Sequence, residues 1–184
     1  QHLGPPAQGQ ALPPVQNLPN NQLMLQSNIR VRHNVGIANN VQIEARLNDQ
    51  GQPDSDRRAR VRLNTGEYFG FRPENATGTR IAVSSMNFDV EPGGLSTVGI
   101  NGANMAAQLY FRGELIEQTT GSALLAKNVT NPGTGVGRFV FPTPNGYAAF
   151  DELRIVALNG PNDSFYMDNL QETVPAGQFT EIVA

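Results

Sequence analysis

Apolar and polar residues alternate with a period of two along much of this chain. The clearest run is residues 41–47, where every second side chain is apolar. Because successive side chains of a β-strand point to opposite faces of the sheet, this pattern predicts a half-buried antiparallel strand. The same pattern predicts further strands around residues 61–63, 98–100, 107–111, 139–141, 153–157 and 165–167.

The alternation changes phase once, between residues 81 and 90. Ile81 and Val83 occupy odd positions, whereas Met86 and Phe88 occupy even ones. A shift by one residue moves the apolar side chains to the other face of a sheet, so the segment predicts either a bulge or two short strands.

Turn-forming residues separate the predicted strands at intervals of roughly 8–15 residues, which is typical of β-sandwiches. Two short segments have a composition compatible with helix, and we expect a loop at residues 101–107 and a single turn at residues 122–128. The 184-residue chain is therefore predicted to be all-β, a single jelly-roll-like antiparallel β-sandwich with an extended N-terminal arm. We expect the sandwich at residues 23–174 and a C-terminal tail at residues 175–184.

The N-terminal arm, residues 1–22, contains five prolines together with several Gln and Asn residues. Proline lacks a backbone donor, so the arm is predicted to be neither a helix nor a central strand. It is either a flexible linker or an element that docks on its own domain or on a neighbouring subunit. Residues 22–26 have the alternating apolar side chains of a donated strand, but they can equally begin the first strand of the chain's own sandwich. The candidate partner-binding residues are Leu12, Val15, Leu18, Leu23 and Leu25.

Composition narrows the class of protein. Only 16% of residues are charged, the net charge is −3, and a cluster of four arginines within residues 57–62 follows three aspartates, so we expect no nucleic-acid binding. The absence of cysteine excludes disulfides and thiolate chemistry. No apolar run is long enough to span a membrane. A composition rich in Gly, Asn, Thr and Gln, with Lys127 as the one lysine, favours an exported protein.

The segment at residues 80–171 has an order of motifs that resembles a known group of proteins. Its last two motifs read Phe150-Asp151-Glu152-Leu153-Arg154-Ile155-Val156-Ala157 and Ser164-Phe165-Tyr166-Met167-Asp168-Asn169-Leu170. This half of the chain is similar to the jelly-roll domains of bacterial secreted and surface-anchored proteins, including proteins with PEP-CTERM sorting tails and repeat adhesins. The resemblance implies a jelly-roll fold and an extracellular or cell-surface location of the bacterial type.

Catalytic motifs are absent from the sequence. The two histidines, His2 and His33, are too few for a histidine-based metal centre, and no nucleophile motif or phosphate-binding loop occurs. The adjacent carboxylates Asp151 and Glu152 lie in a predicted strand, where neighbours point to opposite faces and cannot act together. We therefore expect that the protein is not an enzyme.

Calcium is the metal that the sequence favours, because hard cations take carboxylate and carbonyl oxygens from tight loops. Asp49, Asp54 and Asp56 belong to a predicted loop at residues 48–56, for which a solvated turn with arginine counter-ions is the alternative. Asp89, Asp168 and Asn169 are predicted to meet where strands end, and backbone capping is the alternative there. The candidate ligands are Asp49, Asp54, Asp56, Asp89, Asp168 and Asn169.

Function follows from the arm and from the absence of catalytic motifs. We expect a structural subunit of an extracellular filament or surface layer, which self-associates through arm or strand contacts. The alternative is a calcium-dependent carbohydrate-binding or adhesin module for a surface glycan, although the chain has no tryptophan to stack on a sugar. One of its three glycosylation sequons is Asn128-Val129-Thr130, which is compatible with a glycosylated surface protein.

Overall fold

A computed structural model of the chain describes residues 15–17, 22–24, 30–34, 41–47, 53–74, 80–92, 99–159, 163–173 and 180–181. Side chains are described for residues 61–73, 80–92, 99–159, 165–168, 171 and 173. Within these ranges the protein consists of β-strands and one five-residue helix, α1 (Gly121–Leu125). In the described part of the chain, no helix is both long and apolar enough to cross a membrane.

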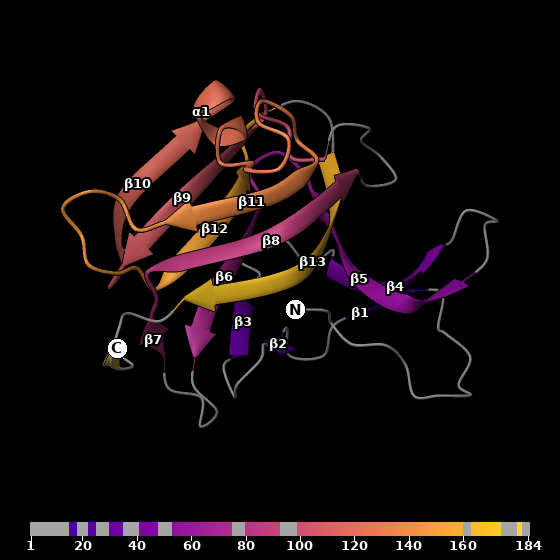
Figure 1. The fold of residues 1–184 in the computed structure, drawn as a ribbon, viewed down its shortest axis with the longest axis horizontal. Coiled ribbons are helices and arrows are strands. Elements are labelled where there is room, and N and C mark those ends of the chain that lie inside the picture. Colours follow the sequence, from indigo (N-terminus) through magenta and orange to yellow (C-terminus); the bar gives the residue numbers. More distant parts are fainter. Residues whose placement is uncertain are drawn as a thin grey trace.

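Most strands belong to two six-stranded antiparallel sheets, and a part of each sheet packs face to face against the other as a sandwich (Figure 1). The strands of sheet A are, in spatial order, β1 (Val15–Asn17), β4 (Val41–Leu47), β5 (Pro53–Leu63), β13 (Asp163–Thr173), β8 (Ser85–Pro92) and β11 (Gly137–Pro142). The strands of sheet B are, in spatial order, β10 (Glu114–Thr120), β9 (Met105–Phe111), β12 (Glu152–Ala157), β6 (Tyr68–Glu74), β3 (Arg30–Asn34) and β2 (Gln22–Met24).

Among the side chains that the structure describes, the apolar ones of both sheets face one shared core. In β8, the buried residues Met86, Phe88 and Val90 alternate with more exposed neighbours, as the pleat of a strand requires. Phe71 of sheet B meets Phe88 of sheet A in this core, with ring centroids 5.6 Å apart. The predicted all-β sandwich is therefore confirmed. The fully buried phenylalanines are Phe69, Phe71, Phe88, Phe139, Phe141, Phe150 and Phe165.

The change of phase at residues 81–90 corresponds to two separate strands, as one of the two predictions states. The first, β7 (Ile81–Ala82), pairs with β14 (Thr180–Glu181), whereas β8 belongs to sheet A. Ser84 lies between β7 and β8, and its amide donates to the carbonyl of Thr173 at 2.8 Å.

The strand predicted around residues 98–100 is not formed at Ile100. The residue is buried, with 1% of its surface exposed, but it lies in a bend rather than in a strand. Gly99, just before it, has a φ of 71°, and a Cβ there would overlap the carbonyl of Gly135. The apolar pattern at this point therefore reports burial under a neighbouring loop, and Val98 lies outside the described residues. The single turn predicted near residue 122 is confirmed as α1.

Between β5 and β13 the chain passes repeatedly from one sheet to the other. β5, β8, β11 and β13 lie in sheet A, and β6, β9, β10 and β12 lie in sheet B. These crossings bring β9, β12 and β6 side by side in sheet B, although they are far apart in the sequence. The outer face of these three strands carries the candidate site.

Candidate functional site

The candidate site lies on the outer face of sheet B and is centred on β12. Leu153 and Ile155 of β12 face the core, so the pleat directs Glu152, Arg154 and Val156 outward. Side chains from β6 and β9 meet them there. We call these residues the Arg154 cluster, which consists of Tyr68, Arg72, Gln108, Tyr110, Glu152 and Arg154.

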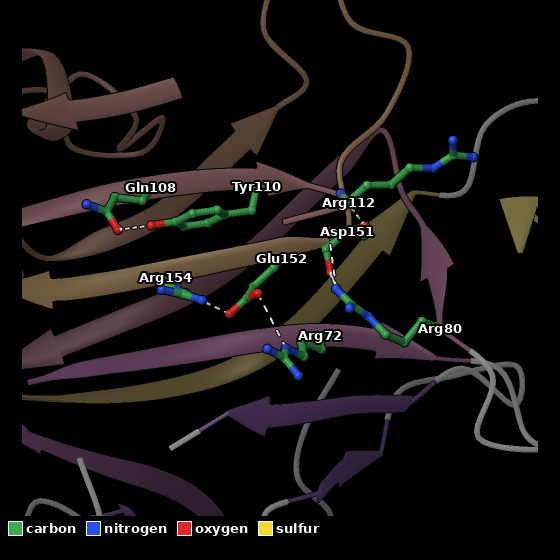
Figure 2. A network of polar contacts seen from close by, with 8 residues as sticks. All are labelled: Arg72, Arg80, Gln108, Tyr110, Arg112, Asp151, Glu152 and Arg154. Atoms are coloured by element: carbon green, nitrogen blue, oxygen red, sulfur yellow. Dashed lines mark hydrogen bonds and ion pairs between the residues drawn. The ribbon is translucent and has the colours of Figure 1, made fainter. Parts of the chain in front are cut away.

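The guanidinium of Arg154 is held on three sides. Its centre lies 4.4 Å from the ring centroid of Tyr68 and 4.2 Å from that of Tyr110, on the two strands that flank β12. Its Nε donates to Oε2 of Glu152 at 2.7 Å (Figure 2). Neither Nη atom donates to another described residue, and 23% of the side chain is exposed. Arg154 is thus fixed in place while its terminal donors stay open to solvent.

Glu152 is the buried anion of the cluster, with only 4% of its side chain exposed. Its Oε1 lies 3.4 Å from Nε of Arg72, and its Oε2 accepts from Arg154. A buried carboxylate needs such partners, because removing it from water is costly. Two positive charges therefore face one negative charge, which leaves the trio with a net positive charge.

The surroundings of Arg154 raise its pKa. Burial lowers the pKa of Arg154, but the hydrogen bond and the charge of Glu152, together with Tyr68 and Tyr110, raise it, and the net shift is upward. Rings that face a guanidinium add cation–π attraction in the same direction.

Amide groups extend the cluster toward β10. The hydroxyl of Tyr110 donates to Oε1 of Gln108 at 2.9 Å, and Nε2 of Gln108 donates to Oε1 of Gln118 at 2.8 Å. The register of β9 and β10 sets Gln108 opposite Gln118, so the two amides lie on the same face. This face of sheet B thus combines neutral donors and acceptors with a fixed cation.

Asp151 has different partners from its neighbour Glu152, as strand alternation predicts. Its Oδ1 lies 3.2 Å from Nη2 of Arg80, and its Oδ2 accepts the backbone amide of Arg112 at 2.8 Å (Figure 2). Burial raises the pKa of Asp151 above its ordinary value, although the Arg112 amide and the charge of Arg80 oppose the shift. Asp151 ties the β9–β10 turn, where Arg112 has a φ of 52°, to the start of β12.

Two of the predicted calcium ligands are brought together by the sheet. The register of β8 and β13 sets Asp89 opposite Asp168. Oδ1 of Asp89 accepts from Nη1 of Arg138 at 3.0 Å, so an arginine already binds this carboxylate. The side chain of Asn169 lies outside the described residues. Within the side chains that are described, no group of three or more His, Cys, Asp or Glu residues could hold a metal.

Of the other three predicted calcium ligands, the backbones of Asp54 and Asp56 are described, and they lie in a strand rather than in the predicted loop. Asp54 and Asp56 lie in the first half of β5, which pairs with β4 and extends beyond the part of β5 that pairs with β13. Their side chains, and the whole of Asp49, are outside the described residues.

The candidate partner-binding residues are described at two backbone positions. Val15 in β1 pairs with Glu44, and Leu23 in β2 pairs with Val31. Both partners belong to the same chain, and both strands lie at the outer end of a sheet. The remaining three, Leu12, Leu18 and Leu25, lie outside the described residues.

The Arg154 cluster was not predicted as a site. Its sequence signal is the i, i+2 pair Glu152 and Arg154 on a strand, which share one face. The rest of the cluster depends on the pairing of β6, β9 and β12. Comparisons with models of protein families, with curated proteins and with solved structures find no match to this chain.

Proposed function

We propose that this protein is an extracellular β-sandwich module that binds a surface glycan on the outer face of sheet B. One observation carries the proposal: Arg154 is clamped between Tyr68 and Tyr110 while its Nη donors remain open to solvent. Binding sites of this kind need a few fixed polar groups on a rigid scaffold. Strands supply a more rigid scaffold than loops do.

The chemistry of the face suits a sugar. Hydroxyl groups both donate and accept hydrogen bonds, and the amides of Gln108 and Gln118 offer both functions within one row. Tyr110 adds an aromatic edge and a hydroxyl to that row. A glycan lying across β10, β9 and β12, in that order, would meet these groups in succession.

A jelly-roll topology and a surface location belong to the same proposal. The strand order β5-β13-β8-β11 opposite β10-β9-β12-β6 supports a double Greek key of eight strands. The exported-type composition and the resemblance to bacterial surface domains support the location.

Self-assembly is the second candidate function, and β10 is the observation that favours it. β10 is the terminal strand of sheet B, and within the described residues no strand pairs with its other edge. Leu115 on this strand is 49% exposed. Such an edge can accept a strand from another chain. Because β1 and β2 pair within their own chain, β10 supports assembly more directly than the arm does.

Calcium remains a proposal as a structural ion near Asp89 and Asp168, supported by their opposite positions in β8 and β13. A melting temperature of the full chain that rises with calcium and falls again with a chelator would support it. An unchanged melting temperature would argue against it.

The test of glycan binding uses the full chain on an array of neutral and acidic oligosaccharides, followed by calorimetry on the positive probes. Tyr110→Ala should weaken binding at least about tenfold, which is a modest loss for an aromatic residue in a binding site. Tyr147→Ala is the matched control, because Tyr147 is 48% exposed and does not belong to the Arg154 cluster. A chain that binds no oligosaccharide, or that binds equally well after Tyr110→Ala, would contradict the proposal.

Assembly has a separate readout. Sedimentation velocity of the full chain should show oligomers that Leu115→Lys converts to monomers, since a charge on an edge strand blocks strand addition. A wild-type chain that stays monomeric at high concentration would exclude assembly through β10.

A further inference from the structure

The two Nη groups of Arg154, which have no described partner, determine what the Arg154 cluster can bind. Rings from the strands on both sides of β12 lie against the guanidinium, and Glu152 occupies its Nε. Hydrogen bonds of a guanidinium lie in its plane. The two Nη groups are therefore the positions at which a ligand acceptor can bind.

The net positive charge of Arg72, Glu152 and Arg154 determines which kind of ligand acceptor the Nη groups favour. Glu152 is shared between Arg72 and Arg154, so one positive charge of the trio has no described counter-ion. An anion is the complement of such a patch, and a carboxylate matches the two parallel donors of a guanidinium fork in a bidentate pair. Glu152 cannot occupy this position itself, because its Oε2 already accepts from Nε.

Arg154 is preorganised for binding. A free arginine side chain loses rotamer freedom when it binds, whereas Arg154 is already fixed by two rings and one carboxylate. The cost of ordering the side chain is met during folding, which favours a specific contact over diffuse attraction.

We propose that the ligand of the Arg154 cluster is an acidic sugar, whose carboxylate binds the two Nη groups of Arg154 in the plane of the guanidinium. This inference rests on the proposed glycan-binding function and names the class of glycan. Neutral hydroxyls of the same glycan meet Gln108, which lies opposite Arg154 in the register of the sheet, and Gln118, which lies opposite Gln108 on the next strand.

The experiment compares three probes on the full wild-type chain: an oligomer of galacturonic acid, the same oligomer fully methyl-esterified, and a sulfated galactose oligomer. Methyl esterification removes the ligand's charge and leaves the protein unaltered. We expect the acid to bind at least tenfold more tightly than the ester, and the preference to shrink at high salt. Equal binding of acid and ester would overturn the inference while leaving glycan binding intact.

Two arginine variants locate the carboxylate. Arg154→Lys keeps the charge but lacks the fork, and we expect it to lose most of the preference for the acid over the ester. Arg112→Gln removes an exposed arginine outside the Arg154 cluster and should keep the full preference.

The remaining outcomes are equally decisive. Tighter binding of the sulfated probe than of the acid would overturn the carboxylate assignment. If Arg154→Lys keeps the full preference for the acid over the ester, the carboxylate does not need the two Nη groups of a guanidinium, and the proposed bidentate contact is overturned. Failure of all three probes, together with a negative array, would remove the proposed function itself.

Discussion

Glu152 and Arg154 lie two residues apart on β12, and Nε of Arg154 donates to Oε2 of Glu152 at 2.7 Å on the outer face of sheet B. The carboxylate is almost fully buried there and also contacts Arg72. An ion pair on the outer face of a sheet is normally solvated and contributes little. This one is enclosed by the Arg154 cluster, so its loss has consequences for both stability and binding.

Replacement of Glu152 by Gln should destabilise the fold. The change keeps the size of the side chain but removes the anion between Arg72 and Arg154. Because both arginines remain partly exposed, we expect a loss of about 1–2 kcal/mol rather than the larger cost of a fully buried pair. Urea unfolding measures it, with the exposed Glu114→Gln as the control, and equal midpoints for wild type and Glu152→Gln would contradict it.

Asn128 should be the most sensitive asparagine among the described residues. Its side chain is fully buried, and its Nδ2 donates to the carbonyls of Thr134 and Val136, both at 2.9 Å. Its Oδ1 accepts the amide of Asn131 at 3.0 Å. Asn128→Ala removes these three hydrogen bonds at once, although the carbonyl of Val136 still accepts from the side chains of Asn131 and Thr134. We therefore expect a loss of about 3 kcal/mol in the free energy of unfolding.

The control for Asn128→Ala is Asn145→Ala, since Asn145 lies in an exposed turn and its replacement should change stability by less than about 0.5 kcal/mol. Similar losses in both variants would show that Asn128 does not organise its loop. The same burial corrects the interpretation of the sequon Asn128-Val129-Thr130, because the amide that would carry a glycan is enclosed. Mass spectrometry of folded protein should find no glycan at this site.

The sequence predicted the strands that are apolar on one side only. Residues 41–47 and 153–157 alternate because one face of each strand is apolar, and β4 and β12 have nearly these bounds. β10 escaped the pattern because it is a largely polar edge strand, in which Thr119 is the only buried residue. β6 escaped it because Gly70 interrupts the outward positions with no side chain. Alternation of apolar and polar residues therefore reports which side chains are buried, and it predicts a strand only where one face of that strand is buried.

Sites that depend on register could not be predicted in the same way. The sequence suggested that Asp89 and Asp168 meet, and the pairing of β8 with β13 sets them opposite each other. It gave no sign of Arg138, which reaches Asp89 only because β11 pairs with the other edge of β8. The Arg154 cluster has the same origin. Which side chains meet depends on strand pairings that are separated by tens of residues in the chain.

Gly137→Ala should be far more costly than Gly113→Ala. Both glycines have a positive φ, 146° at Gly137 and 84° at Gly113. A Cβ at Gly137 would overlap the hydroxyl of Thr130 and the amide of Asn128, whereas a Cβ at Gly113 meets no atom within 4 Å. Gly113→Ala should cost about 1–2 kcal/mol from backbone strain alone, and Gly137→Ala should cost more because the Asn128 network must move. Equal thermal midpoints for the two variants would contradict the packing at Gly137.

Asp151 should make stability fall as the pH rises. Burial raises the pKa of Asp151 in the folded protein above the ordinary value of 3.8, with the Arg112 amide and Arg80 opposing the shift. Between these two pKa values the folded chain holds the proton and the unfolded chain has released it, so the folded state binds more protons. The contribution of Asp151 to stability is therefore fully present below pH 3.8 and is lost as the pH rises through the raised pKa.

Asp151→Asn isolates this contribution, because the amide stays neutral at every pH. The difference in unfolding free energy between variant and wild type cancels the titration of the other carboxylates. It should move in favour of the variant as the pH rises from 3 to 7, even though Asn cannot form the ion pair with Arg80. Titration of the Asp151 carboxyl carbon by NMR gives the same pKa directly. A midpoint below 3.8 would mean that Arg80 and the Arg112 amide outweigh burial, and the slope would then have the opposite sign.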